Sequence, residues 1–391
     1  MPFCLRILRS VGLWENRKYF YRFVFACFWI GCIILFPKAV FGMGSNRFDS
    51  MAKGWSEFIY QANLVGAAVI FAAKGTCFKQ LIELLARIID EATDNDLTGN
   101  CYKEIRRQNG QIDKFAKFYG IYCCICPMLF SISSIITTNI QYFTADRNSS
   151  EELKFEIPME QKFYGMHVRT NYLHYNIFLA ISMTSYYCCA FVSVVKVSTM
   201  IIMVKYCSLA FRLVAIQVQD LSQLPQNTPK TPKLIRIVNL HNNAFEVTDL
   251  AEEILCFPVM MQFMSTVLFW CTTMLYMSTN LDYTLLNVLV IFFLSMIETY
   301  GYSYLGSQLT DEAAAVGAAI YDLPWYNEPP ELQRQYRLVL QRSQLETGIT
   351  AAKFFIVGID KFGSLAQMSY SYYLVLKDTL TMRIENGMMQ D

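Results

Sequence analysis

Three uninterrupted uncharged stretches limit what this chain can fold into. Residues 118–145, 170–195 and 254–281 contain no Asp, Glu, Lys or Arg over 28, 26 and 28 positions. A helix needs about 20 mostly apolar residues to cross the hydrocarbon layer of a membrane. Each stretch is therefore expected to form a membrane-spanning helix.

Four shorter uncharged stretches have the same character. They cover residues 23–36, 58–73, 283–297 and 362–376. They reach spanning length if charged groups at their ends extend to the membrane surface or face protein. The sequence therefore predicts an all-α, seven-transmembrane helical protein. The approximate bounds of the spans are 21–43, 56–75, 117–144, 171–198, 254–281, 283–306 and 348–378.

Composition and charge exclude several other classes of protein. Charged residues make up 17% of the chain, compared with about 25% in an average soluble domain. The 33 basic and 32 acidic residues nearly balance, so no surface for nucleic acid is indicated. Nine of the 13 cysteines fall in predicted spans, where they act as small apolar side chains. We therefore expect no disulfide scaffold, metal site or cofactor.

The distribution of Lys and Arg predicts a cytoplasmic N-terminus and an extracellular C-terminus. With this orientation the inner segments carry 23 basic residues and the outer segments with their adjoining span edges carry 9, in accordance with the positive-inside rule. The first 20 residues lack the pattern of a signal peptide, so the first span is expected to remain. The sequon at Asn148 then lies outside, where it is either glycosylated or an unmodified polar turn.

Helical extensions are expected beneath the membrane. Spans four to six continue into polar segments, and a short helix over residues 331–344 follows a proline pair. We expect residues 199–253 and 307–347 to form a cytoplasmic anchor region. The whole chain, residues 1–391, is predicted to form a single seven-helix membrane domain that includes this region. The buried or solvated His241 lies in this region and is not expected to be a ligand or a base.

Five short motifs in the C-terminal third carry a family resemblance. They are YSYLG (302–306), AAIY (318–321), PWY (324–326), QRSQ (341–344) and SYSYY (369–373). In this order and spacing the chain resembles the insect odorant receptors. The loop at residues 229–234 is short, so the resemblance is to an odour-tuned subunit and not to the shared co-receptor.

The resemblance implies an odorant-gated, non-selective cation channel in the plasma membrane of olfactory sensory neurons. In that family the subunit forms a heterotetramer with the co-receptor, and no G protein takes part. The resemblance also implies that the last helix is split into a cytoplasmic anchor part and a pore-lining span. An odorant enters a pocket in the outer half of the helical bundle.

One face of the last span is the candidate pore lining. Its residues recur at intervals of three or four, as expected for one side of a helix. The resemblance places the outer gate near Val375, and apolar constrictions can gate by dewetting. The predicted stripe consists of Leu365, Met368, Tyr372, Val375 and Thr379.

The candidate odorant pocket draws on the outer halves of spans two, three, four and six. A small volatile, aromatic or heteroaromatic, offers few polar atoms, so burial among apolar and aromatic side chains should supply its affinity. Hydroxyl groups can then fix its orientation. The predicted pocket residues are Asn63, Ala67, Ile70, Phe71, Phe130, Ser134, Thr137, Tyr175, Leu179, Ser182, Tyr186, Asn287 and Ile291.

Three charged residues are expected within the spans. Asp360 and Lys361 are neighbours on the last helix, about 100° apart, so ideal pairing with each other is not expected. Glu298 is the predicted partner of Lys361. Buried charges in a membrane need a partner or water.

Other functions are weighed against the channel. A gustatory-receptor-like channel is the closest alternative, followed by a transporter, although no repeat of two homologous halves is visible. The chain has three histidines and no nucleophile elbow, phosphate-binding loop or zincin motif, so it is not expected to be an enzyme.

Overall fold

The computed structural model describes most of the chain. The described residues are 6, 8, 9, 12, 19–42, 48–94, 96, 98–144, 154–223, 229–279 and 285–385. The Asn148 sequon lies outside them.

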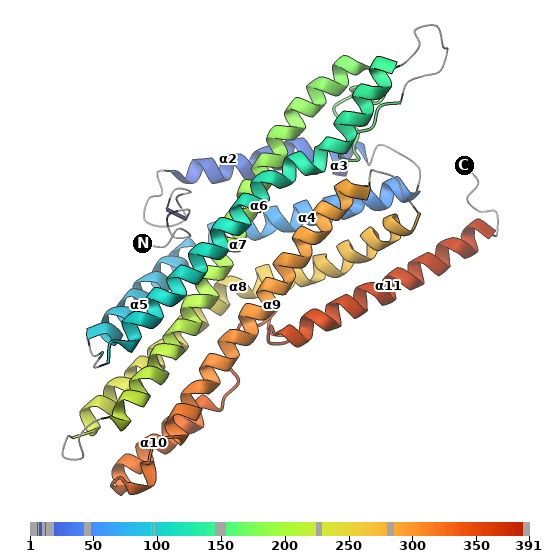
Figure 1. Cartoon of the computed structure of the whole chain (residues 1–391). Helices are drawn as coiled ribbons and strands as arrows, with labels where there is room; N and C mark the ends of the chain where they lie inside the picture. Colours follow the sequence, from blue (N-terminus) through green and yellow to red (C-terminus); the bar gives the residue numbers. More distant parts are fainter. Residues whose placement is uncertain are drawn as a thin grey trace.

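The described residues are almost entirely helical, as predicted (Figure 1). Two isolated bridges, Phe163 with Met166 and Thr350 with Ile356, are the β-type pairings among them. In chain order the elements are α2 (Phe20–Ile30), the π-helical turn η2 (Gly31–Leu35), α3 (Phe36–Phe41), α4 (Phe48–Ala73), α5 (Gly75–Asp94), α6 (Asn100–Thr144), α7 (Tyr172–Ser222), α8 (Thr231–Thr279), α9 (Leu285–Tyr321), the short 3-10 helix η3 (Trp325–Asn327), α10 (Pro330–Ser343) and α11 (Ile359–Glu385).

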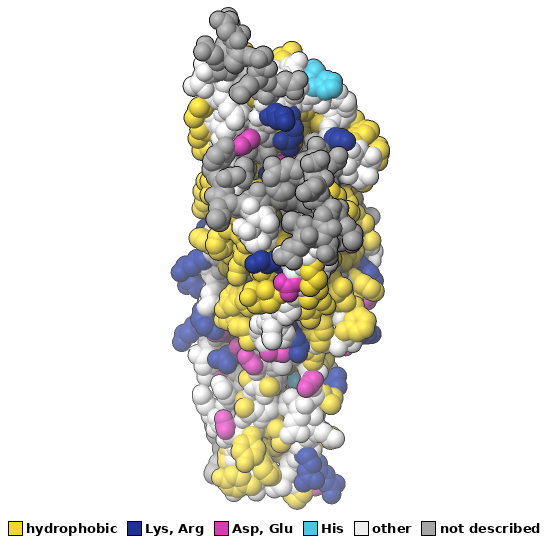
Figure 2. All heavy atoms as spheres, turned by 90° about the vertical axis from the view of Figure 1, so that its right-hand side faces the viewer, with side chains coloured by type: hydrophobic (Ala, Val, Ile, Leu, Met, Phe, Trp, Pro, Cys, Tyr) yellow, Lys and Arg dark blue, Asp and Glu magenta, His cyan; other side chains and the backbone are white. Residues whose placement is uncertain are grey.

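Six helical segments in the described part of the chain are long and apolar enough to cross a membrane. They lie at Phe20–Phe41, Met51–Ala73, Asn100–Thr144, Tyr172–Ser222, Thr231–Thr279 and Leu285–Tyr321. α11, the seventh expected span, is not among them. In Figure 2, hydrophobic side chains cover the middle of the visible face, with charged side chains on either side of this belt. The chain is a multi-pass helical membrane protein.

α7 lies at the centre of the bundle. It is 51 residues long, which at 1.5 Å per residue is about 75 Å, far more than a membrane span requires. Between Val192 and Leu221 almost every side chain is buried. This explains why the sequence there is apolar on all sides of the helix, since a helix of that kind is covered all round.

The segments predicted to form the anchor region are the C-terminal parts of α7 and α9, the N-terminal part of α8, and α10. Leu332, Tyr336 and Val339 are the buried face of α10, and α10 packs on α9. His241 is buried next to Phe211 and Phe245. Burial, with a smaller contribution from Arg342, lowers the pKa of His241 to about 4, so it is a packed, neutral histidine at pH 7.

The last helix begins later than the sequence predicts. Residues 344–358 form a turn in which the N–H of Ala351 donates to the Phe355 carbonyl at 2.9 Å. Ala352 and Lys353 have φ of 47° and 64°, a left-handed conformation that is incompatible with a right-handed helix at these positions. The first eleven residues of the predicted span 348–378 are therefore not helical, and α11 starts at Ile359.

The turn before α11 docks closely on α9. A Cβ built on Gly306 would lie 2.2 Å from the carbonyl oxygen of Val357. Only glycine allows the two backbones to come this close. The glycine of the YSYLG motif therefore fixes where the last helix begins relative to α9.

Candidate functional site

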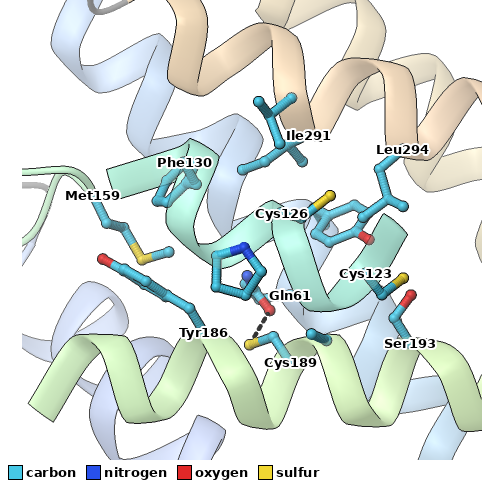
Figure 3. Close-up of a pocket in the computed structure, with 14 residues that line it drawn as sticks. Gln61, Cys123, Cys126, Phe130, Met159, Tyr186, Cys189, Ser193, Ile291 and Leu294 are labelled. Atoms are coloured by element: carbon cyan, nitrogen blue, oxygen red, sulfur yellow. Dashed lines mark hydrogen bonds between the residues drawn. The ribbon is translucent and has the colours of Figure 1, made fainter. Parts of the chain in front are cut away.

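A cavity, here called the outer cavity, lies between α4, α6, α7 and α9 (Figure 3). About 500 Å³ between its side chains is not filled by protein atoms, including the part that opens to the surface. Its lining consists of Tyr60, Gln61, Cys123, Cys126, Pro127, Phe130, Met159, Tyr186, Cys189, Ala190, Ser193, Val290, Ile291 and Leu294.

The outer cavity is lined mostly by apolar, aromatic and sulfur-containing side chains. The rings of Phe130 and Tyr186 meet edge to face with centroids 5.2 Å apart. Met159 lies beside them, and Cys123 and Cys126 add sulfur atoms to the wall (Figure 3). Aromatic rings and polarisable sulfur favour contact with an aromatic or alkyl ligand.

Two hydroxyl groups near the outer cavity are poised for a ligand. The hydroxyls of Ser182 and Tyr186, one turn apart on α7, are buried and interact with each other, although neither makes a hydrogen bond of good geometry within the described part of the chain. A buried polar group without a partner costs about 1–3 kcal/mol. A ligand that brings an acceptor or donor to Tyr186 would recover part of this cost. Gln61 is engaged, because it accepts a hydrogen bond from Cys189 at 3.0 Å.

A buried ion pair lies behind the wall of the outer cavity, in contact with the lining residues Tyr60 and Ser193. Lys196 Nζ lies 2.7 Å from Glu298 Oε2, and both side chains are at most 3% exposed. Tyr119 and Ser193 donate to the other carboxylate oxygen at 2.6 and 2.9 Å. Tyr60, which lines the outer cavity, approaches the same oxygen at 3.5 Å. The charges are thus compensated by several hydrogen bonds, as burial in a low-dielectric interior requires.

The prediction that Glu298 pairs with Lys361 is wrong. Glu298 is paired with Lys196. Because Lys196 directly follows the uncharged stretch 170–195, the sequence placed it near the inner membrane surface and not inside the bundle. Lys361 instead contacts Asp360 at 2.9 Å. The expectation that these neighbours would not pair fails because they lie in the first turn of α11, where both side chains are partly exposed and free to turn toward each other.

The cluster around the ion pair also reaches α8. Lys196 donates to Gln262 Oε1 at 2.9 Å, and Asn63 donates to the same oxygen at 2.6 Å. Gln262 in turn donates to Thr266 and Thr299. We call Lys196, Glu298 and these hydrogen-bonded neighbours the polar cluster. It joins α4, α6, α7, α8 and α9 at one level of the bundle.

Three of the predicted pocket residues line the outer cavity. They are Phe130, Tyr186 and Ile291. The other ten do not line it. Ser134, Tyr175 and Asn287 form a hydrogen-bonded group in which Asn287 Nδ2 donates to Ser134 Oγ and the Tyr175 hydroxyl to the Ser134 carbonyl, both at 3.2 Å.

The remaining predicted residues are distributed through the bundle. Asn63 belongs to the polar cluster, and Ser182 is buried near Tyr186. Ala67 and Phe71 are buried on α4, with Phe71 in a separate small cavity beside Phe78 and Met203. Three others are half-buried, namely Ile70, Thr137 and Leu179.

Most of the lining was missed because the depth of the cavity could not be predicted. Cys123, Cys126 and Phe130 follow helical spacing on α6, and Tyr186, Cys189 and Ser193 do so on α7. That periodicity was visible in the sequence. On α6 the cavity lies deeper in the bundle than most of the residues chosen, whereas on α4 it lies on the other side of the chosen residues, at Tyr60 and Gln61. Met159 comes from a loop that carries no periodic signal.

The predicted pore stripe is mostly uncovered in the single chain. Met368, Tyr372 and Val375 are 45%, 51% and 63% exposed, and Thr379 is exposed as well. Leu365, in contrast, is buried in the core of the chain. The outer part of α11 therefore presents apolar side chains that this chain does not cover.

Comparison with known proteins identifies the family. The profile of the family described as 7tm Odorant receptor matches residues 58–370. Odorant receptor 2a of Drosophila melanogaster is 23% identical over 148 residues, 37% of each chain. The odorant receptor coreceptor of Anopheles gambiae is 28% identical over 122 residues, covering 30% of this chain and 26% of that protein. The chain thus aligns with less than two fifths of the length of these relatives.

The solved structures agree in fold. The insect olfactory receptor OR5 from Machilis hrabei in complex with eugenol has a TM-score of 0.73 at 12% identity, covering 93% of this chain and 90% of that one. A second structure of that receptor has a TM-score of 0.70 at 16% identity, covering 95% and 96%. At this identity the likeness establishes the fold, while the matched profile covers well over half of the sequence. The chain belongs to the 7tm odorant receptor family.

Proposed function

We propose that this protein is the odour-tuned subunit of a ligand-gated, non-selective cation channel, with the outer cavity as its odorant site. The observation that carries the proposal is a largely apolar cavity with the buried Tyr186 hydroxyl at its wall, enclosed in an odorant receptor fold. Apolar walls with one or two polar groups suit a small volatile molecule.

The expected ligand is an aromatic or heteroaromatic volatile with one hydrogen-bonding group. Phe130 and Tyr186 can contact a ring edge to face, and the Tyr186 hydroxyl can bind an oxygen atom. The structural relative from Machilis hrabei was solved with eugenol, which supports this class of ligand without identifying the odorant of this chain.

The polar cluster offers a route from the outer cavity to the last helix. Tyr60 and Ser193 touch both the cavity and Glu298, and Gln262 extends the cluster into α8. α8 and α9 are the helices that carry α11. In that contact Phe362 of α11 packs against Trp270 and Tyr300, with ring centroids 5.8 and 5.4 Å away. A ligand that displaces α7 or α9 would therefore move the support of α11.

The proposal places α11 at a central pore shared with other subunits. Met368, Tyr372 and Val375 need cover from other chains or from a water-filled pore, because this chain leaves them exposed. The co-receptor is the proposed partner, in a heterotetramer within the plasma membrane of an olfactory neuron. The N-terminus is then cytoplasmic, the C-terminus is extracellular, and no G protein is required.

The test is whole-cell recording from cells that express the chain with and without an insect co-receptor while small volatiles are applied. Ala190→Phe should fill the outer cavity and raise the half-maximal odorant concentration at least about tenfold, since it excludes a ring-sized group. Ala180→Phe is the matched control, because Ala180 lies on the exposed side of the same helix and should leave the response unchanged.

Either of two outcomes would refute the proposal. Odorant-evoked current in cells without the co-receptor would contradict the heteromeric channel. No current in either condition, with surface delivery confirmed by labelling, would instead favour the gustatory-receptor-like channel or the transporter. Uptake of labelled substrate without channel-sized conductance would distinguish the transporter.

A further inference from the structure

A second and larger cavity, here called the inner cavity, lies between α6, α7 and α9 on the other side of the polar cluster. It encloses about 1110 Å³ of unfilled space including its open part, more than twice that of the outer cavity. Tyr119 and Glu298 form its deep end, and Phe115, Tyr300 and Tyr304 its aromatic wall. It is not part of the proposed odorant site.

The inner cavity opens at the level where the predicted spans end. Phe115, Tyr300 and Tyr304 are 37%, 47% and 48% exposed, so the aromatic wall reaches the surface of the protein. The predicted span three begins at residue 117, and spans four and six end at residues 198 and 306; each of these positions is one or two residues from a residue that lines the cavity. Aromatic side chains of this kind are typical of the boundary between lipid tails and head groups.

Basic residues lie at the polar end of the inner cavity. Arg107, Gln111 and Phe115 are four residues apart on α6, so they lie on the same side of that helix. Gln111 and Phe115 line the cavity, which places Arg107 one turn beyond it. From α7, Lys205 lines the cavity directly. The groove therefore has basic side chains at one end and aromatic, apolar side chains along the rest of its length.

Lys205 lacks a carboxylate partner, unlike its basic neighbours. Arg107 pairs with Glu104, and Arg212 contacts Glu312 at 3.8 Å. Within the described part of the chain, Lys205 makes its hydrogen bond to the neutral amide oxygen of Gln308 at 2.6 Å. Burial and the nearby Arg107 lower the pKa of Lys205, and Glu312 and Glu104 oppose this shift only partly. An anion at this point would compensate the half-buried ammonium group.

We propose that the inner cavity binds an anionic lipid, with the acyl chain along Phe115, Tyr300 and Tyr304 and the head group at Lys205 and Arg107. Charge complementarity selects an anionic over a zwitterionic lipid, because Lys205 lines the cavity with only a neutral amide as its hydrogen-bond acceptor, whereas the carboxylate of Glu298 at the deep end is already compensated by Lys196. Both a free fatty acid and an anionic phospholipid have this chemistry. The proposal does not depend on odorant gating, because it concerns binding alone.

The experiment is photocrosslinking to the full-length chain, expressed together with the co-receptor and purified in mild detergent. The probes are diazirine-bearing palmitate, phosphatidylserine and phosphatidylcholine, with labelled peptides mapped by mass spectrometry. We expect palmitate, phosphatidylserine or both to label residues 111–119 or 297–305, and phosphatidylcholine to label them weakly. The anionic probe that labels these residues shows whether the ligand is a fatty acid or a phospholipid. Excess unlabelled anionic lipid should abolish the labelling of the unaltered protein. Equal labelling by phosphatidylcholine would overturn the proposal.

Two substitutions test the two ends of the groove. Lys205→Gln should reduce anionic labelling about tenfold, the loss expected for one charge-assisted contact of about 1.4 kcal/mol, whereas the exposed Lys79→Gln should not change it. Gly301→Leu should block the acyl chain, because Gly301 lines the cavity and a Cβ there meets open space.

Gly120→Leu is the matched control for Gly301→Leu, since Gly120 also has open space and lies outside the cavity. Unchanged labelling in both Lys205→Gln and Gly301→Leu would refute the site. A monodisperse peak in size-exclusion chromatography shows that a variant is folded. If a variant does not give such a peak, the competition by unlabelled anionic lipid on the unaltered protein tests the proposal instead.

Discussion

Replacing Lys196 tests whether the buried ion pair holds the centre of the bundle. Lys196→Met keeps the length of the side chain and removes its charge. It leaves Glu298, which is 2% exposed, with hydroxyl donors alone. Removing one partner of a buried pair costs about 3–5 kcal/mol. For a folded-to-unfolded equilibrium this is roughly two to three and a half orders of magnitude.

The double variant makes the test specific for pairing. Glu298→Leu alone leaves the Lys196 ammonium buried with Gln262 as its neutral acceptor, and a similar loss is expected. Lys196→Met combined with Glu298→Leu removes both charges. Tyr119 and Ser193 can still bond to each other, because their oxygens are 2.7 Å apart. The double variant should therefore lose only about 1–2 kcal/mol.

The assay is thermal unfolding of the purified chain, followed by the loss of the monodisperse peak in size-exclusion chromatography. Each single variant should lower the midpoint by about 5–10 °C, and the double variant should recover most of that difference. Lys74→Met is the control, because Lys74 forms an exposed ion pair with Glu253, and exposed ion pairs contribute little to stability. If the double variant were as unstable as the sum of the single variants, the two charges would not be coupled and the reasoning would fail.

Three further predictions concern other parts of the fold. Gly306→Ala should destabilise the protein by about 1–3 kcal/mol in the same thermal assay, because the Val357 backbone is the obstacle, whereas Gly120→Ala, with open space, should be neutral or stabilising. Burial lowers the pKa of His241 to about 4 in the folded protein. As the pH falls below about 6.5, His241 therefore becomes protonated in the unfolded chain before it does so in the folded protein. This difference should lower the free energy of unfolding by about 3 kcal/mol between about pH 6.5 and pH 4. His241→Phe should flatten this part of a pH series of unfolding midpoints, and an unchanged slope would contradict the buried, neutral state. Val375→Ala should alter ion permeability or rectification in cells that also express the co-receptor, and identical current–voltage curves would remove Val375 from the gate.

The helical architecture was predictable because it depends on local sequence. Uncharged stretches located the membrane-crossing segments, and the proline-containing segment after Ser222 marked the break between α7 and α8. The start of α11 was not predictable, because it depends on left-handed residues at Ala352 and Lys353 and on a close contact with Gly306. Neither residue type at 352 and 353 favours that conformation, so tertiary contacts decide it.

The candidate site was predictable only in part, for a similar reason. Phe130, Tyr186 and Ile291 came from the right helices, but the relative depth of four helices is a tertiary property. The partner of Glu298 was missed because Lys196 ends an uncharged stretch and was assigned to the membrane surface. Long helices that continue beyond the membrane place such residues at unexpected depths, because the end of an uncharged stretch no longer coincides with the end of a helix.

The position of Lys196 along α7 has a mechanical consequence. Residue 196 lies next to the midpoint of a helix that runs from Tyr172 to Ser222, and the ion pair with Glu298 holds α7 there. A rod held at its middle acts as a lever with two arms, each about 38 Å long at 1.5 Å per residue. For every degree of tilt, the two ends move in opposite directions by about 0.7 Å. A rigid tilt of α7 about this point would therefore move the segment around Ser222 by the same distance as the Tyr172 end, in the opposite direction.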